Sequence, residues 1–207
     1  MMQKWKVKGV RTLDKETQKR SFRIKDLQFR SKVTGDGDGS SPVIVEGHAA
    51  VFNERTLIED CYYEEIAPET FAKDLAEGRD VRCLFNHNWD KILGRRSART
   101  LELDEDEQGL HFIVELPNTT YAHDLEESMR RGDICECSFL FFPTSQEEDF
   151  SLDLPLIRIT GAELYEVSIV TLPQYESAKA SLRSKQLVWR ATKRHQILEK
   201  IGGYLNE

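Results

Sequence analysis

The stretch Glu136-Cys137-Ser138-Phe139-Leu140-Phe141-Phe142 carries one hydroxyl side chain in a run of large apolar residues, and it predicts a β-strand. A second run, Val81-Arg82-Cys83-Leu84-Phe85, predicts a strand that ends directly before Asn86-His87. A serine and a histidine held on or beside strands can act as a nucleophile and the general base that activates it. Ser138 and His87 are therefore candidates for acyl-transfer chemistry.

The rest of the chain predicts several more strands and a few helices. Apolar or alternating runs bounded by turn residues predict strands, and apolar side chains four residues apart predict short helices. The expected strands are 21–29, 43–52, 100–104, 110–116 and 157–172, and 100–104 forms a hairpin with 110–116. The expected helices are 67–76, 119–131, 176–180 and 187–204, with an acidic loop at 147–153. This pattern indicates a mainly β, or α+β, single domain.

Charge is distributed unevenly along the 207 residues. The net charge is −7, yet the segment 4–32 is dominated by lysine and arginine. A basic arm of this kind can touch an acidic partner or nucleic acid, but it is more often a solvated extension, and no nucleic-acid-binding motif accompanies it. No apolar run approaches the roughly 20 residues that span a bilayer, and no signal sequence opens the chain. We expect neither a membrane nor nucleic acid as a partner, and we expect no export.

Four cysteines, Cys61, Cys83, Cys135 and Cys137, could pair or bind metal. Only Cys135 and Cys137 are close in sequence, and their spacing is not that of a tetrahedral metal site. Reduced, partly buried cysteines of an intracellular protein are the expected state. We expect no metal and no cofactor.

Each candidate catalytic residue has a structural alternative. His87 could be a surface histidine with a local hydrogen bond, and Ser138 could be a buried serine that only bonds the backbone. A carboxylate that orients the histidine is expected at Glu166 or Glu163, which lie on opposite faces of one strand. Glu166 is favoured because it shares its face with Leu164, Ser168 and Val170, a set that looks largely buried. A carboxylate there needs a partner, although it could instead face water at a sheet edge.

The order of short motifs resembles the prohead proteases of tailed bacteriophages, which are similar to the herpesvirus assembly proteases. The resemblance covers roughly residues 43–180, and each motif alone is degenerate. The motifs that carry it are Gly47-His48-Ala49-Ala50-Val51-Phe52-Asn53, Ile66-Ala67-Pro68-Glu69-Thr70-Phe71, Val81 to His87, Ile92-Leu93-Gly94-Arg95, Leu116-Pro117-Asn118-Thr119, Arg131-Gly132-Asp133, Ser138-Phe139 and Glu163 to Pro173.

The resemblance implies a single-domain closed β-barrel of about seven strands surrounded by a few helices. It implies a serine endopeptidase that cleaves scaffold protein, or the scaffolding arm of the capsid protein, and itself, in the host cytoplasm inside the procapsid. Ser138 would be the nucleophile, His87 its base and Glu166 the orienting group, with Glu163 as the alternative. Arg95 or nearby backbone N–H groups would stabilise the oxyanion, unless Arg95 only pairs with a carboxylate. Self-association is plausible.

On this basis we expect a basic extension with the first strand at 1–42, the protease domain at 43–183 and a helical tail at 184–207. The family pattern Gly-Met-Ser-Phe-Gly-Phe is altered here, since Glu136 and Leu140 replace its glycines. Close backbone approach is then harder, and a carboxylate stands near the serine. A catalytically weak or inactive assembly module that binds capsid protein is therefore the alternative function. A metal-dependent nuclease, suggested by Asn86-His87-Asn88, is a weaker one.

Overall fold

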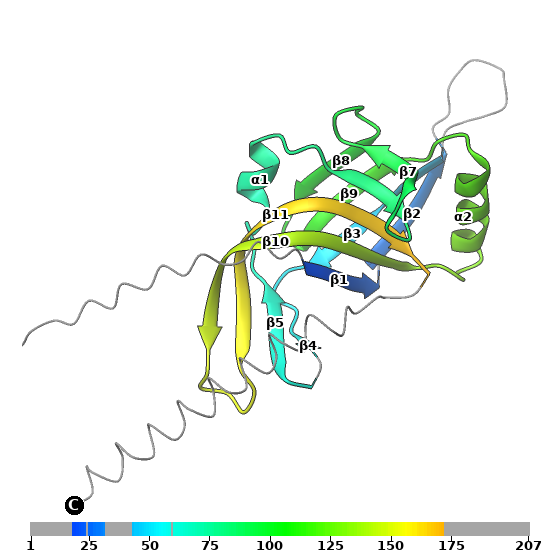
Figure 1. Ribbon diagram of the computed structural model, residues 1–207. Helices are drawn as coiled ribbons and strands as arrows, with labels where there is room; N and C mark the ends of the chain where they lie inside the picture. Colours follow the sequence, from blue (N-terminus) through cyan, green and yellow to red (C-terminus); the bar gives the residue numbers. More distant parts are fainter. Residues whose placement is uncertain (1–17, 24, 32–42, 59, 172–207) are drawn as a thin grey trace, which may run out of the picture.

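The computed structural model describes residues 18–23, 25–31, 43–58 and 60–171, and within 18–31 the side chain of Arg20 alone. These residues form eleven strands in two sheets, together with two helices (Figure 1). The expected helices at 176–180 and 187–204 lie outside the described residues. No helix within the described ranges is long and apolar enough to cross a membrane.

The larger sheet is built around a long antiparallel hairpin of β10 and β11, which curves across the molecule in Figure 1. Its strands run in the order β1 (Gln18–Arg23), β10 (Glu136–Asp149), β11 (Leu156–Val170), β5 (Tyr62–Ile66) and β4 (Thr56–Ile58), while β6 (Arg82–Phe85) pairs with β11 and with β7 (Asn88–Arg95). β5 and β6 both run parallel to β11, β5 along its first part and β6 along its last part.

The acidic loop expected at 147–153 is wrong in its first part, because β10 continues to Asp149. Glu147 is aligned with Arg158 on β11, so opposite charges face each other across the strands. Glu147 and Asp149 are exposed, whereas the residues between Glu136 and Pro143 are mostly buried. An acidic sequence can therefore continue a strand where the hairpin extends beyond the core.

The smaller sheet has the order β2 (Lys25–Ser31), β3 (Val43–Val51), β9 (Gly109–Glu115) and β8 (Leu101–Glu105). The predicted hairpin is confirmed as β8 and β9. Gly109 is required where β9 meets β3, because a Cβ atom there would lie 1.9 Å from the carbonyl oxygen of Ala50. Side chains from both sheets, such as Phe112 and Phe139, belong to one hydrophobic core.

The single strand expected at 21–29 is divided between the two sheets. Its first half is β1, which pairs with β10, and its second half is β2, which pairs with β3. The expectation of a closed barrel is also wrong, since both sheets are open in the described residues. β11 is long enough to be paired by β5 and β6 in succession, so the larger sheet spreads along this strand instead of closing on the smaller one.

Both expected helices in the described part of the chain are present. α1 (Ala72–Ala76) is shorter than predicted, and it follows Phe71, whose ring packs edge-on against Phe139 at 5.8 Å between centroids. α2 (Thr120–Arg130) buries side chains spaced three and four residues apart, as an amphipathic helix does. Its Tyr121 hydroxyl donates a hydrogen bond to the Ile92 carbonyl at 2.8 Å and joins α2 to β7.

An ion pair between two strands of the larger sheet, β1 and β5, holds β1 in place. The Arg20 guanidinium bonds both carboxylate oxygens of Glu64 on β5, with Nη2 2.7 Å from Oε2. The Arg20 guanidinium also lies over the ring of Phe141, 5.8 Å from its centroid. Both charged side chains are almost fully buried, so the pairing replaces hydration that each has lost. The N-terminal strand is thereby fixed along the edge of β10.

Candidate active site

Ser138 lies in the middle of the paired part of β10, between two neighbouring strands. It is aligned with Ser168 on β11 and with Ser21 on β1. Its side chain is fully buried, and its Oγ has no hydrogen-bond partner. A purely structural serine would bond the backbone, as the alternative interpretation requires. An unbonded hydroxyl is instead consistent with a nucleophile.

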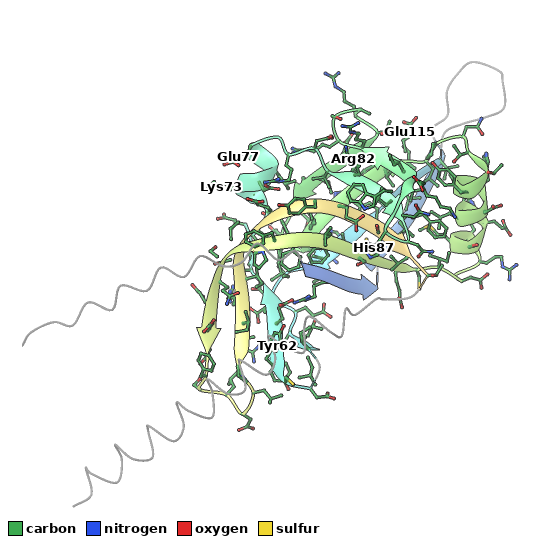
Figure 2. The ribbon with its side chains drawn as sticks, viewed as in Figure 1. Tyr62, Lys73, Glu77, Arg82, His87 and Glu115 are labelled. Carbon is green, nitrogen blue, oxygen red and sulfur yellow. The ribbon has the colours of Figure 1, made fainter. Side chains whose placement is uncertain are left out.

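His87 lies in the two-residue turn that joins β6 to β7 (Figure 2). Asn86 and His87 both have left-handed backbone conformations, with φ of 55° and 56°, as in a type I′ hairpin turn. Asn86 tolerates this conformation well, and its Oδ1 accepts a hydrogen bond from the Thr171 backbone N–H at 2.9 Å. A further bond runs from the Asn86 N–H to the Ile169 carbonyl at 2.9 Å. The turn, and with it the imidazole, is therefore tied to the end of β11.

Glu166 on β11 is the carboxylate that meets His87. Nδ1 of His87 donates a hydrogen bond to Oε1 of Glu166, and the Ser168 hydroxyl donates one to Oε2 at 3.2 Å. The carboxylate is 1% exposed, so these donors replace the water that it has lost. With Nδ1 engaged, Nε2 of His87 is the ring nitrogen left for chemistry, and it is buried without a partner.

The sheet brings these groups to one face. Leu84, Ser168 and Ser138 are aligned across β6, β11 and β10, and residues aligned in this way share a face. Glu166 lies two residues from Ser168 and so is on the same face. Nε2 of His87, on the ring that bonds this carboxylate, and Oγ of Ser138 both lack a hydrogen-bond partner. They are not bonded to each other here, and catalytic hydrogen bonds often tighten only when substrate binds.

Glu163, the alternative orienting group, belongs to a different cluster. Its Oε2 accepts a hydrogen bond from the Tyr165 hydroxyl at 2.8 Å and lies 3.3 Å from Nη2 of Arg79. The bond to Glu163, followed by burial, raises the pKa of Tyr165. Arg79 also bonds Asp74, which anchors α1 against β11 through the Leu164 N–H. Glu163 thus takes part in a structural network and does not contact His87.

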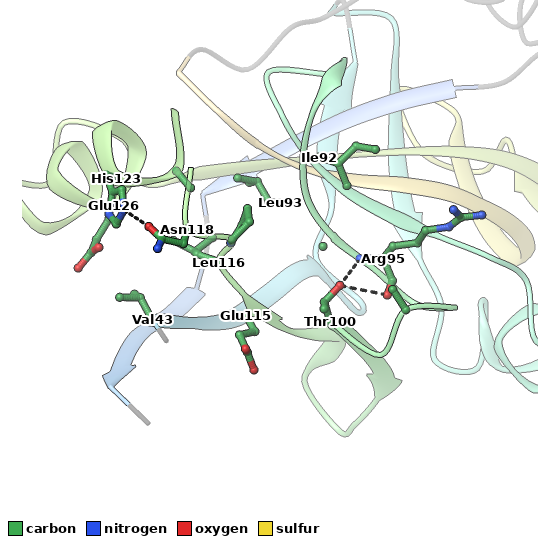
Figure 3. Close-up of a pocket in the computed structure, with 14 residues that line it drawn as sticks. Val43, Ile92, Leu93, Arg95, Thr100, Glu115, Leu116, Asn118, His123 and Glu126 are labelled. Atoms are coloured by element: carbon green, nitrogen blue, oxygen red, sulfur yellow. Dashed lines mark hydrogen bonds between the residues drawn. The ribbon is translucent and has the colours of Figure 1, made fainter. Parts of the chain in front are cut away.

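Arg95 is paired with Asp80 in this structure. Its Nε and Nη2 lie 2.8 and 2.5 Å from Oδ2 of Asp80, and the hydrogen bonds hold the pKa of that carboxyl well below its usual range. Arg95 also borders an apolar cavity of about 510 Å³ between β7 and α2, which contains none of the three candidate catalytic residues (Figure 3). The structural alternative for Arg95 is observed, and its role at the oxyanion stays a prediction.

Cys137 and Cys83, which lie beside the site, are less suited than Ser138 to act as the nucleophile. Burial raises the pKa of Cys137 and of Cys83 well above the usual range of a thiol. The thiolate is the reactive form, so both thiols are held in their unreactive state. Cys61 and Cys135 are also free thiols, and the described residues contain no group of three or more side chains that could hold a metal ion.

Two residues that position the site were not assigned a role from sequence. Ser168 bonds Glu166, and its place on the Glu166 face, two residues along the strand, was the available signal. Asn86 shapes the turn that carries His87. An Asn directly after a strand and before another polar residue signals a tight turn, but sequence alone does not tell which residues take the left-handed conformation.

Comparison with known proteins also points to a serine protease. A family profile of the caudovirus prohead serine proteases matches residues 26–192. The bacteriophage T4 capsid assembly protease gp21 is similar in structure, with a TM-score of 0.54 at 9% sequence identity, and the match covers 78% of this chain and 100% of that one. No curated protein sequence matches significantly. Because the family profile matches most of the length of the chain, the chain belongs to the caudovirus prohead serine protease family.

Proposed function

We propose that this protein is a serine endopeptidase that cleaves scaffold protein, or the scaffolding arm of the capsid protein, and itself, during procapsid maturation. The observation that carries the proposal is the arrangement around Glu166. This buried carboxylate bonds Nδ1 of His87, while Nε2 of His87 and Oγ of Ser138 are left without partners on the same face of the sheet. A nucleophile, a base and an orienting acid are the three roles that acyl transfer needs.

In the proposed reaction, Nε2 of His87 takes the proton from the Ser138 hydroxyl as Oγ attacks the substrate carbonyl carbon. Glu166 stabilises the imidazolium that results and keeps the ring in the required tautomer. His87 then gives the proton to the leaving amine, and water releases the peptide acid from Ser138 by the reverse sequence of proton transfers. Backbone N–H groups near Ser138, or Arg95 after release from Asp80, would bind the oxyanion.

The partners and the place of action are proposed by analogy with the family and with the protein of similar structure. The T4 protein is a capsid assembly protease. By analogy, the substrates of this chain are scaffold and major capsid protein, and the reaction takes place inside the procapsid in the host cytoplasm. Self-association is part of the proposal, because a protease packed inside a shell works at high local concentration.

An inactive assembly module that binds capsid protein is the second candidate. The observation that favours it is the complete burial of Ser138, combined with the replacement of both family glycines by Glu136 and Leu140. A protein of this kind keeps the fold and the partner but does not cut.

Co-expression with the major capsid protein of the same genome separates the two candidates. The unmodified chain, Ser138→Ala, His87→Ala and the exposed-loop control Ser151→Ala are each co-expressed, and all products are measured by intact-mass spectrometry. A protease shortens the capsid protein or itself in the unmodified and control forms only. Co-purification without shortening in all four forms supports the assembly module, and cleavage that survives Ser138→Ala contradicts the protease.

A further inference from the structure

Glu136 carries a carboxylate oxygen that the fold leaves unused beside the candidate nucleophile. The residue begins β10, two positions before Ser138, so both side chains lie on the same face of the strand. Two residues of an antiparallel strand span about 7 Å. Oε2 of Glu136 is buried and has no hydrogen-bond partner.

The described arginines on β6, on β7 and directly after α2 have other partners. Arg131, the closest in sequence, pairs with Asp133 at 2.9 Å. Arg95 pairs with Asp80, and Arg82 lies 3.5 Å from the same carboxylate and over the ring of Trp89. Burial of a carboxylate oxygen without a hydrogen-bond donor costs free energy. A charged donor that binds there offsets this cost.

The same carboxylate would oppose the negative charge that develops at the scissile carbonyl, unless a cation neutralises it. A substrate can bring that cation. An extended peptide also advances about 3.4 Å per residue, so a basic side chain roughly two positions from the scissile bond would reach Glu136 when the carbonyl is at Ser138.

We infer that Glu136 is a specificity-determining residue that selects peptides with lysine or arginine about two positions from the scissile bond. The inference rests on the proposed endopeptidase function and adds a substrate class to it. The glycine that the family pattern has at this position offers no carboxylate, so the selectivity belongs to this chain.

The test uses the full chain and a mixture of synthetic peptides of diverse sequence, with products identified by mass spectrometry. The best peptide is then resynthesised with lysine, glutamine or glutamate at each position within three residues of the cut. A hydrogen bond to a charged group corresponds to a preference of roughly tenfold to a hundredfold. We expect such a preference in kcat/KM for lysine over glutamate at one position.

Matched variants assign the preference to Glu136. Glu136→Gln keeps the shape of the side chain without its charge, and it should reduce the preference for lysine over glutamate to below about threefold. Glu136→Lys should reverse the preference, in favour of glutamate. Glu147→Gln, an equal change on the exposed end of the same strand, should leave it unchanged. Arg23→Gln, at the position aligned with Glu136 on β1, should leave it at least as strong. A lysine preference that survives Glu136→Gln in a folded protein, or is lost in Arg23→Gln, overturns the inference.

Failure of the inference is distinguishable from failure of the proposed function. A fluorophosphonate probe reports whether Ser138 is an activated nucleophile, independently of peptide sequence. Labelling at Ser138 with cleavage that ignores or avoids basic residues overturns the role of Glu136 alone. Absence of both labelling and cleavage overturns the endopeptidase and, with it, the substrate class.

Discussion

Nδ1 of His87 donates a hydrogen bond to Oε1 of Glu166, a carboxylate that is 1% exposed on the central strand β11. The contact joins a residue in a tight turn to one that is fixed by pairing on both sides of its strand. The turn places His87 next to β11, and the paired strand holds Glu166 rigidly. The imidazole is therefore oriented before any substrate binds.

Replacing Glu166 by glutamine should abolish most of the activity without unfolding the protein. The amide can accept at its oxygen but cannot stabilise an imidazolium, and a change of this kind in an orienting carboxylate lowers kcat by roughly 10³- to 10⁴-fold. The measurement is kcat/KM on a cleaved peptide, with circular dichroism as the check of folding. Glu163→Gln is the matched control on the same strand, and it should cost little activity because Glu163 bonds Tyr165 and Arg79. Equal losses in both variants would contradict the assignment of Glu166.

Ser168→Ala tests the second donor to Glu166. Its loss leaves Oε2 of a buried carboxylate without the 3.2 Å bond, and such a loss costs about 1–3 kcal/mol of stability. Activity should fall by no more than roughly tenfold, because the bond from His87 remains. Urea unfolding and peptide kinetics measure the two effects, and Ser151→Ala in an exposed loop provides the comparison. A fall as large as that of Glu166→Gln would show that Ser168 takes part in the chemistry itself.

The local elements of the fold could be predicted from the sequence, but the arrangement of the strands into two open sheets could not. The hairpin of β8 and β9 and the helix α2 follow from runs of apolar residues with the correct period. The division of residues 18–31 between two sheets could not be predicted, because no glycine or proline marks a boundary between the segments that form β1 and β2. β5 was not expected, because the sequence Tyr62-Tyr63-Glu64-Glu65-Ile66 gains its strand character from parallel pairing with the distant strand β11. β7 was not expected either, although it pairs with its neighbour in sequence, β6.

The candidate site could be predicted in its residue types but not in its connections. A hydroxyl in an otherwise apolar strand drew attention to Ser138, and a carboxylate on a largely buried face, which needs a partner, drew attention to Glu166. Which partner each obtains depends on strand register, which a single strand sequence does not contain. Arg95 illustrates the limit, because its charge fits an oxyanion role, whereas the fold places it against Asp80.

The ion pair of Arg20 and Glu64 should be important for stability. Glu64→Gln removes the negative charge that meets the buried guanidinium in this pair, and breaking a buried pair in this way costs about 3–5 kcal/mol. The double variant Arg20→Met/Glu64→Leu removes both charges and should lose much less. Urea unfolding of the full chain measures both. Glu77→Gln, which changes an exposed pair with Lys73, should shift stability by under about 0.5 kcal/mol. A double variant as unstable as Glu64→Gln would show that packing, and not charge pairing, holds β1.

Asp106 should make a stabilising contribution that is lost only in strong acid. Burial favours its neutral form, but hydrogen bonds from Nε2 of His48 at 2.8 Å and from the N–H groups of Gln108 and Gly109 outweigh burial. Together they lower the pKa of Asp106 from 3.8 to about 2. In the unfolded chain the carboxyl titrates near 3.8, so the folded state holds fewer protons between these two values.

The contribution of Asp106 is therefore complete above pH 4 and disappears as the pH falls through about 2. Asp106→Asn cannot titrate, so the free energy of unfolding of the wild type should exceed that of the variant by a constant amount from pH 5 to pH 7, and the difference should shrink below pH 4. Because the carboxylate is 42% exposed, the difference should be small and should decrease in high salt. Urea unfolding at a series of pH values measures it, with Asp153→Asn as an exposed control that should show no such trend. A difference that stays constant down to pH 2 would mean that the bonds to Asp106 do not depend on its charge.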